Sequence, residues 1–243
     1  MGSTIVAHEG ELPQVQDLPL DSSAGTIGID VSHYQGDISW GAVAGAGVRF
    51  VYMKATEGSG FVDPAFSANY TGSTGAGMVR GAYSFALPDR ASGAAEASYF
   101  LAHGGGWSAD GRTLPPVLDI EYNPYNAQAV CYGLNQQQMT GWVQDFANTV
   151  HNQIGRWPVI YTTTNWWTMC TGNTSALSRC PLWIARYNTA VGQLPAGWAD
   201  YTLWQHSDGA PNLPGDQDYF NGSVNDLAGF ATGSESDSLL GLP

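Results

Sequence analysis

The run PVLDIE at residues 116–121 carries two carboxylates two positions apart. Because side chains alternate between the two faces of a β-strand, Asp119 and Glu121 share one face, while Leu118 and Ile120 share the other. Two carboxyl groups held close together raise the pKa of one of them, which can then stay protonated near neutral pH and act as a general acid. We predict this role for Glu121, at the C-terminal end of the strand. Asp119 would adjust the pKa of Glu121. The alternative is a pair that binds a cation or an Arg or Lys side chain.

Further acidic residues stand where other strands would begin or end. Asp30 lies near the end of the apolar run 27–31, and Asp216 and Asp218 lie in the segment GDQDYFNG at residues 215–222. Taken singly, each is more typical of a helix cap, a turn or a fragment of a calcium loop. A closed barrel, however, gathers catalytic groups from the ends of several strands on one face. We therefore expect these acids to join the pair described above in one cluster.

Aromatic residues occur in or beside the same short strands. Sugar rings stack their apolar faces on such planes, so a cleft lined in this way suits a glycan. Ordinary core packing is the alternative for a good part of them. The predicted substrate-binding aromatic residues are Tyr83, Tyr122, Tyr161, Trp183 and Tyr187.

Other chemistries lack their sequence patterns. The five histidines form no HExxH pair, no serine lies in a Gly-x-Ser-x-Gly elbow, and no GxGxxG or GxxxxGK[ST] loop occurs. Zinc peptidases, serine hydrolases and nucleotide-dependent enzymes are therefore disfavoured. We expect no cofactor and no metal.

Composition narrows the range of partners. The chain has 243 residues, of which only 12% are charged, and its 21 acidic against 8 basic residues give a formal net charge of −13. Such a field repels nucleic acid and anionic lipid headgroups. No apolar run approaches the roughly 18 residues that a membrane span needs. Neither nucleic acid nor membrane is an expected partner, and a monomer is the default expectation.

Short β-like runs alternate with helix-compatible segments from Thr26 onward, which is typical of βαβ units and a mainly parallel sheet. We predict strands at 27–31, 49–54, 79–85, 116–121, 158–162, 181–186 and 201–205, with a short one near 218–220. We predict helices at 39–45, 64–74, 91–103, 135–153 and 164–169. The later connections are short and rich in Gly and Pro, which indicates an α/β barrel whose last part has lost its helices.

The chain divides into one large unit and two ends. Residues 26–230 are predicted to form a single barrel, since an α/β barrel commonly needs roughly 200 to 250 residues. Residues 1–25, with four acids and no Lys or Arg, are predicted to be a surface arm or disordered. The small, polar tail at 231–243 is expected to lie outside the barrel.

The three cysteines are too few for a disulfide scaffold. Cys131 and Cys170 lie in polar, turn-like surroundings and could pair in an exported protein, whereas Cys180 precedes an apolar segment and is expected to be a buried thiol. Three free thiols are the alternative. No leader sequence is visible in residues 1–26, so export is inferred and not read from the sequence.

These motifs together resemble the glycoside hydrolase family 25 lysozymes, the Chalaropsis-type muramidases of fungi, actinomycetes and phages. The resemblance runs in order from about Thr26 to Gly229. It rests on GIDVSHYQGDISW, FVYMKATEG, GAYSFALP, PPVLDIEY, YTTTNWW, PLWIARY, LWQHS and GDQDYFNG. It implies a TIM-like barrel of the (β/α)5(β)3 type, and the Cys131–Cys170 pairing also resembles that of its fungal and actinomycete branch.

The resemblance also implies an activity. The expected reaction is retaining hydrolysis of the β-1,4 bond between N-acetylmuramic acid and N-acetylglucosamine in bacterial peptidoglycan, by a secreted enzyme whose partner is the glycan strand. Carried over by position, the catalytic acids are Asp30, Asp119, Glu121 and Asp216, with Asp218 as a substrate-binding residue. The attacking group is left open between a carboxylate and the 2-acetamido group of the substrate.

Two other functions are compatible with the same residues. A related barrel glycosidase acting on chitin-like polymers would need the same acidic pair and aromatic subsites. An inactive barrel that only binds peptidoglycan would keep the aromatic residues and would not need the acids.

Overall fold

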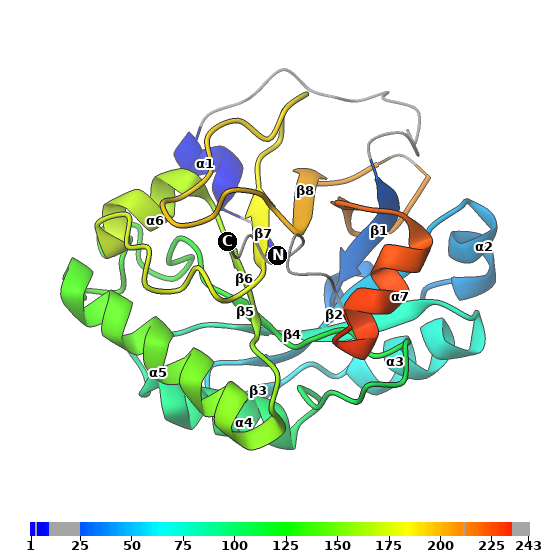
Figure 1. Cartoon of the computed structure of the whole chain (residues 1–243), viewed down its shortest axis with the longest axis horizontal. Coiled ribbons are helices and arrows are strands. Elements are labelled where there is room, and N and C mark those ends of the chain that lie inside the picture. The colour runs from blue at the N-terminus through cyan, green and yellow to red at the C-terminus, as the bar shows by residue number, and fades with distance from the viewer. Residues whose placement is uncertain (3, 10–24, 211, 235–243) are drawn as a thin grey trace.

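Strands β1, β2 and β4 to β9 close into a barrel in the computed structural model, which describes residues 1–2, 4–9, 25–210 and 212–234 (Figure 1). Seven of them run parallel in sequence order, and β9 lies antiparallel between β8 and β1 and completes the circle. The predicted barrel is thus confirmed. The barrel strands are β1 (Thr26–Val31), β2 (Phe50–Glu57), β4 (Val79–Phe85), β5 (Val117–Asp119), β6 (Val159–Thr162), β7 (Leu182–Ala185), β8 (Leu203–Ser207) and β9 (Asp216–Phe220).

Helices follow each of the first five barrel strands. In the described parts of the connections after β7 and β8, residues 186–202, 208–210 and 212–215, no helix forms. This arrangement is the expected (β/α)5(β)3 type. The outer helices are α2 (Trp40–Gly45), α3 (Phe66–Gly75), α4 (Gly93–Ala102), α5 (Gln136–Ile154) and α6 (Thr164–Thr171).

Four elements among the described residues were not predicted, and one of them is the 3-10 helix η1 (His33–Gln35). The two-residue strand β3 (Phe61–Val62) pairs with the end of β2, and helix α1 (Ile5–Glu9) lies near the amino terminus. Helix α7 (Val224–Thr232) follows β9 and begins at Ser223, whose side chain accepts from the backbone N–H of Asp226 in a capping box.

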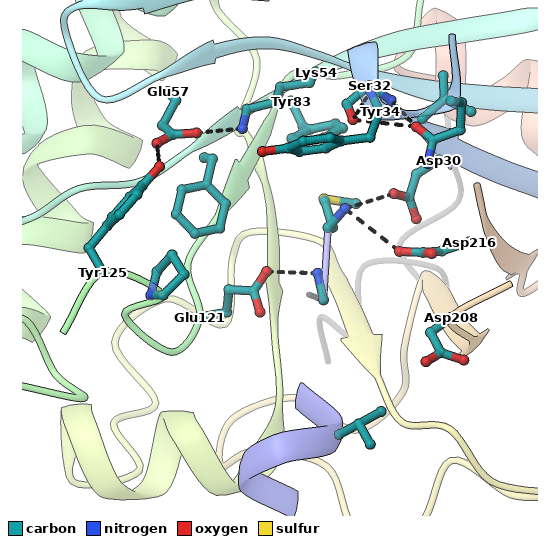
Figure 2. Close-up of a pocket in the computed structure, with 17 residues that line it drawn as sticks. Asp30, Ser32, Tyr34, Lys54, Glu57, Tyr83, Glu121, Tyr125, Asp208 and Asp216 are labelled. Atoms are coloured by element: carbon teal, nitrogen blue, oxygen red, sulfur yellow. Dashed lines mark hydrogen bonds and ion pairs between the residues drawn. The ribbon is translucent and has the colours of Figure 1, made fainter. Parts of the chain in front are cut away.

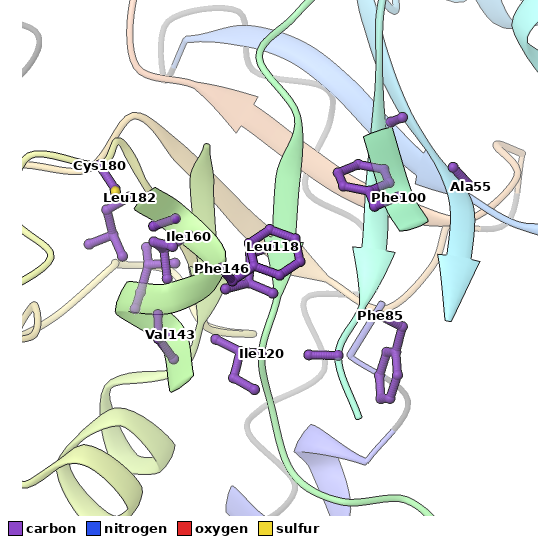
Figure 3. Packing of buried hydrophobic residues seen from close by; sticks show 14 of the residues in the cluster. Ala55, Phe85, Phe100, Leu118, Ile120, Val143, Phe146, Ile160, Cys180 and Leu182 are labelled. Carbon is purple, nitrogen blue, oxygen red and sulfur yellow. The ribbon is translucent and has the colours of Figure 1, made fainter. Parts of the chain in front are cut away.

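The apolar residues form two layers, because each barrel strand has an inward and an outward face. Val117 belongs to a cluster inside the barrel, whereas Leu118 and Ile120 belong to the layer between the strands and the helices. Figure 3 shows this outer layer, where Phe146 of α5 packs with Leu118. The predicted division of the run 116–121 into two faces is confirmed.

Both ends of the described chain contribute buried side chains. Residues 1–25 were expected to be a surface arm or disordered. Within them, Ile5 is only 2% exposed and belongs to the inner cluster. Ala231 was expected to lie in the tail outside the barrel, yet it is buried as part of α7. The rest of the expected arm, residues 10–24, and of the expected tail, residues 235–243, lies outside the described residues.

Cys131 and Cys170 form the disulfide that was expected, with their Cα atoms 5.4 Å apart. Cys131 lies in the connection after β5 and Cys170 lies in α6, so the bond ties a loop near the barrel mouth to an outer helix. Cys180 is a free thiol and is buried, as predicted.

We predict that this disulfide stabilises the fold mainly by restricting the unfolded chain. Its sequence separation of 39 residues corresponds to a loss of about 2–4 kcal/mol in the free energy of unfolding when the bond is removed. Chemical denaturation of the Cys131→Ala/Cys170→Ala double variant measures this loss. The matched control is Cys180→Ala, which removes a sulfur but no cross-link. Equal stability of the parent and the double variant would contradict the prediction.

Candidate active site

Three of the predicted acids, Asp30, Glu121 and Asp216, meet at one end of the barrel (Figure 2). Asp30 lies near the C-terminal end of β1, while Asp216 begins β9; because these two strands are antiparallel, the residues are paired in register. Gly215 precedes Asp216 with a φ of 69°, and a side chain there would overlap the backbone carbonyl of Asp30. The turn therefore requires glycine for the two carboxylates to lie side by side.

Glu121 lies just beyond β5, on the same face as Asp119. It is 1% exposed; its Oε1 accepts a hydrogen bond of 2.7 Å from the backbone N–H of Gly2. Burial raises the pKa of Glu121 from 4.5 to about 7, even though the amino-terminal ammonium and the Gly2 hydrogen bond lower it. A carboxyl group with this pKa is protonated in a large fraction of molecules near neutral pH, as a general acid requires.

Asp119 lies deeper in the barrel and is fully buried. Neither of its carboxyl oxygens has a hydrogen-bond partner among the described residues. Burial raises the pKa of Asp119 well above its ordinary value, and the neighbouring Glu121 raises it further. An ionised carboxylate in this position would be strongly disfavoured, so the environment favours a neutral Asp119 when Glu121 is charged.

The carboxyl groups of β9 lie in similar surroundings. Burial and the charge of Asp30 raise the pKa of both Asp216 and Asp218 well above the ordinary value. Asp218 is fully buried behind the mouth and accepts a hydrogen bond of 3.1 Å from Nε1 of Trp183. Asp218 thus lies in the barrel interior, whereas Asp216 lines the cavity at the barrel mouth.

Gln205 of β8 connects these acids, and nothing in the sequence pointed to it. Its Nε2 donates to Asp30 at 2.7 Å and to Asp216 at 3.1 Å. Its Oε1 accepts from the hydroxyl groups of Tyr161 at 2.6 Å and Tyr187 at 3.0 Å. Every hydrogen-bonding direction of this amide is fixed, so Gln205 is a positioning residue for two of the acids.

A cavity of about 450 Å³ opens beside the acids. Asp30, Glu121 and Asp216 line it together with Tyr83, and on its other side lie three residues that were not predicted, namely Lys54, Glu57 and Tyr125. Lys54 donates to Glu57 at 2.5 Å, and the hydroxyl group of Tyr125 donates to the other oxygen of Glu57. Exposed Tyr34 and Tyr125 form the outer rim.

The five predicted substrate-binding aromatic residues lie in three different settings. Tyr161 and Trp183 are fully buried in the inner cluster, with ring centroids 5.3 Å apart, so neither ring face is open in this structure. Tyr122 stacks on His8 with centroids 4.3 Å apart, and Tyr187 bonds to Gln205. Tyr83 alone of the five lines the cavity.

The structure thus brings together Asp30, Asp119, Glu121 and Asp216, as the sequence predicts. Among the described residues, no group of three or more His, Cys, Asp or Glu side chains is arranged to hold a metal ion. Within the same residues, no helix is long and apolar enough to cross a membrane.

Buried carboxyl groups with raised pKa values at the mouth of an α/β barrel are the groups that acid/base hydrolysis of a glycoside uses. Comparison with known proteins agrees with this class. Residues 29–215 match the family described as Glycosyl hydrolases family 25. The chain belongs to this family.

Individual relatives are similar over most of their length. The chain is 44% identical over 211 residues to an N,O-diacetylmuramidase of Chalaropsis sp, covering 85% of this chain and 99% of that protein. It is 43% identical over 236 residues to Lysozyme M1 of Streptomyces globisporus, covering 95% and 80%. The solved structure of a muramidase from Acremonium alcalophilum superposes with a TM-score of 0.82 at 53% identity, covering 85% and 99%.

We predict that Glu121 makes the fold less stable at neutral than at acidic pH. Its pKa of about 7 in the folded chain lies above the ordinary 4.5, so its contribution to stability is present below pH 4.5 and is lost as the pH rises through 7. The resulting decrease in the free energy of unfolding is on the order of 3 kcal/mol.

Thermal unfolding of Glu121→Gln from pH 4.5 to pH 8 measures this effect. The variant should gain stability relative to the parent as the pH rises. Asp37→Asn, which removes one charge from an exposed position, serves as the control and should show a small, nearly constant difference. A Glu121→Gln difference that is also constant with pH would contradict the prediction.

Proposed function

We propose that this chain is a lysozyme, an N-acetylmuramidase that hydrolyses the β-1,4 bond between N-acetylmuramic acid and N-acetylglucosamine in bacterial peptidoglycan. The observation that carries the proposal is the buried Glu121 carboxyl group at the barrel mouth, whose pKa is raised to about 7. The names of the relatives, lysozyme and muramidase, support the choice of substrate. The disulfide supports a site of action outside the cell, where such bonds persist.

In the proposed mechanism, Glu121 donates its proton to the glycosidic oxygen as the bond to the sugar C1 breaks. Its Oε2, which has no hydrogen-bond partner among the described residues, is the oxygen suited to carry that proton. Positive charge develops on the sugar ring in the transition state, and the nearby acids stabilise it. Glu121, now ionised, then removes a proton from the water that attacks C1.

Retention of configuration requires a first attack from the opposite face of the sugar. Two groups could make it: a carboxylate, or the 2-acetamido oxygen of the substrate. We favour the 2-acetamido oxygen, because Asp119 has no hydrogen-bonding group among the described residues that would stabilise it as a free carboxylate. A protonated or partly charged Asp119 would instead orient the N–H of the acetamido group. Asp30 and Asp216, held by Gln205, would face the developing charge.

We predict that Glu121→Gln lowers kcat by about 10²–10⁴-fold, since the amide cannot donate a proton of comparable acidity. Mass spectrometry of the soluble products from purified peptidoglycan measures the change. Reducing-end N-acetylmuramic acid from the parent only is the expected result, and Asp37→Asn should match the parent. Wild-type turnover by Glu121→Gln would remove Glu121 from the mechanism.

The same products separate the alternative functions. Reducing-end N-acetylglucosamine, or preferred cleavage of chitin oligomers, would indicate the related glycosidase. Binding of peptidoglycan without release of any reducing end would indicate a non-catalytic barrel. The anomeric form of the first product, followed by NMR, tests retention.

We also predict that activity falls as the pH rises above about 7. The general acid must be protonated, and Glu121 loses its proton through this range. The measurement is kcat/KM on a soluble glycan between pH 4 and 9. A profile that keeps rising beyond pH 8 would contradict the assignment.

A further inference from the structure

A single basic side chain lines the cavity beside the proposed catalytic acids. Lys54 is the only lysine in the sequence, and no other Lys or Arg side chain lines the cavity in the described part of the chain. It is 7% exposed, and its Nζ donates to Glu57 (Figure 2). The acidic residues that line the same cavity are Asp30, Glu57, Glu121, Asp208 and Asp216. A lone lysine is thus placed where acidic side chains predominate.

An irregularity in strand β2 places Lys54 and Glu57 on the same side of the strand. Residues three positions apart in a regular strand lie on opposite faces. In the parallel pairing of β2 with β4, however, the register shifts by one residue between Lys54 and Thr56, and both members of the ion pair line the cavity. Such bulges are rare in parallel pairs and are over-represented next to active sites, where they redirect a side chain. The strand therefore departs from regular geometry at the point that brings this lysine into the mouth.

Two rings and one carboxylate fix the position of the ammonium. Nζ of Lys54 lies 5.2 Å from the ring centroid of Phe85 and 5.7 Å from that of Phe61, distances at which a ring attracts a cation. An ammonium has three N–H donors, and the bond to Glu57 is the only one that Lys54 makes to the described residues. Glu57 also accepts from the hydroxyl group of Tyr125. Two donors of Lys54 therefore remain for a ligand in the cavity.

The muramyl unit of the proposed substrate carries a group that such an ammonium binds. N-acetylmuramic acid differs from N-acetylglucosamine by a lactyl ether on O3, whose carboxyl group is free or joined by an amide bond to the peptide stem. In the proposed reaction the muramyl ring supplies the C1 at which the bond breaks, so this group lies within one sugar ring of Glu121. The charge of Lys54 acts over the same space, because burial raises the pKa of Glu121 and Lys54 opposes that rise. The acids repel a lactyl carboxylate, whereas Lys54 attracts it.

We propose that Lys54 is a specificity-determining residue that binds the lactyl carboxyl oxygen of N-acetylmuramic acid, and that Glu57 competes with this oxygen for the ammonium. The inference rests on the proposed function for the orientation of the sugar in the cavity. This contact lets a cavity lined by acids accept an acidic sugar, because the anionic group lies on the side opposite Asp30 and Asp216. N-acetylglucosamine lacks the group, so Lys54 discriminates between muramyl and chitin-like chains.

Binding measurements on two variants of the ion pair test the contact without turnover. N-acetylmuramic acid, its lactyl methyl ester and N-acetylglucosamine are titrated into each protein and followed by NMR. Lys54→Met should weaken binding of the free acid at least about tenfold, and Glu57→Gln should strengthen it at least about threefold, because the competing carboxylate is gone. Affinity for the ester should change less than that for the acid, and affinity for N-acetylglucosamine should stay within about twofold. Arg112→Met, which removes a positive charge at an exposed position outside the cavity, should match the parent.

Opposite shifts in the two variants are a result that a purely structural role of the ion pair would not produce. Equal affinity of the parent and Lys54→Met for N-acetylmuramic acid, with both folded by circular dichroism, would overturn the contact. Weaker binding of N-acetylmuramic acid by Glu57→Gln would overturn it as well, and this variant decides the question if Lys54→Met does not fold.

Hydrolysis separates this inference from the proposed function. The substrates are a peptide-free muramyl glycan with free lactyl carboxylates and the same glycan with methyl-esterified carboxylates. The ratio of kcat/KM on the free glycan to kcat/KM on the ester should fall at least about tenfold in Lys54→Met. A fall of both values with an unchanged ratio would overturn the specificity role and leave the lysozyme assignment standing. If the parent cleaves neither glycan but the binding pattern holds, the proposed function fails and the Lys54 contact stands.

Discussion

Mutual repulsion among buried carboxyl groups is the constraint on which the rest of this structure depends. Asp30, Asp119, Glu121 and Asp218 are each at most 1% exposed, and Asp216 lies beside them. Burying like charges costs several kcal/mol unless they are protonated, hydrogen-bonded or neutralised. Raised pKa values and directed hydrogen bonds are both present in this structure.

Closure of the barrel brings the groups that stabilise these buried carboxyl groups into position. Since β9 runs antiparallel to β1, its first residue lies at the mouth, where the parallel strands end. Gln205 of β8 then reaches both Asp30 and Asp216, while Trp183 of β7 reaches Asp218. A fully parallel barrel would place the start of its last strand at the opposite end. The reversed strand is therefore part of the active site as much as of the fold.

Local patterns in the sequence were enough for the strands and the acids. Side chains alternate between two faces along residues 116–121, which assigns Asp119 and Glu121 to the barrel interior. The structure agrees, because Leu118 and Ile120 pack in the layer between the strands and the helices. Gln205 could not be predicted, because a glutamine within LWQHS has no distinctive chemistry until three strands converge on it. The contact between Gly2 and Glu121 had no local signal either, because the two residues lie 119 positions apart in the sequence.

The transition state of glycoside hydrolysis places an electrostatic demand on this site. Hydrolysis of a glycoside passes through a sugar ring that carries positive charge, and a cluster of oriented carboxyl groups lowers the energy of that charge. Such a cluster attracts any cation that fits, because the electrostatic free energy depends on charge and distance and not on chemical identity. The clustering that raises the pKa values of these carboxyl groups is thus a direct consequence of the electrostatic preorganisation that catalysis requires.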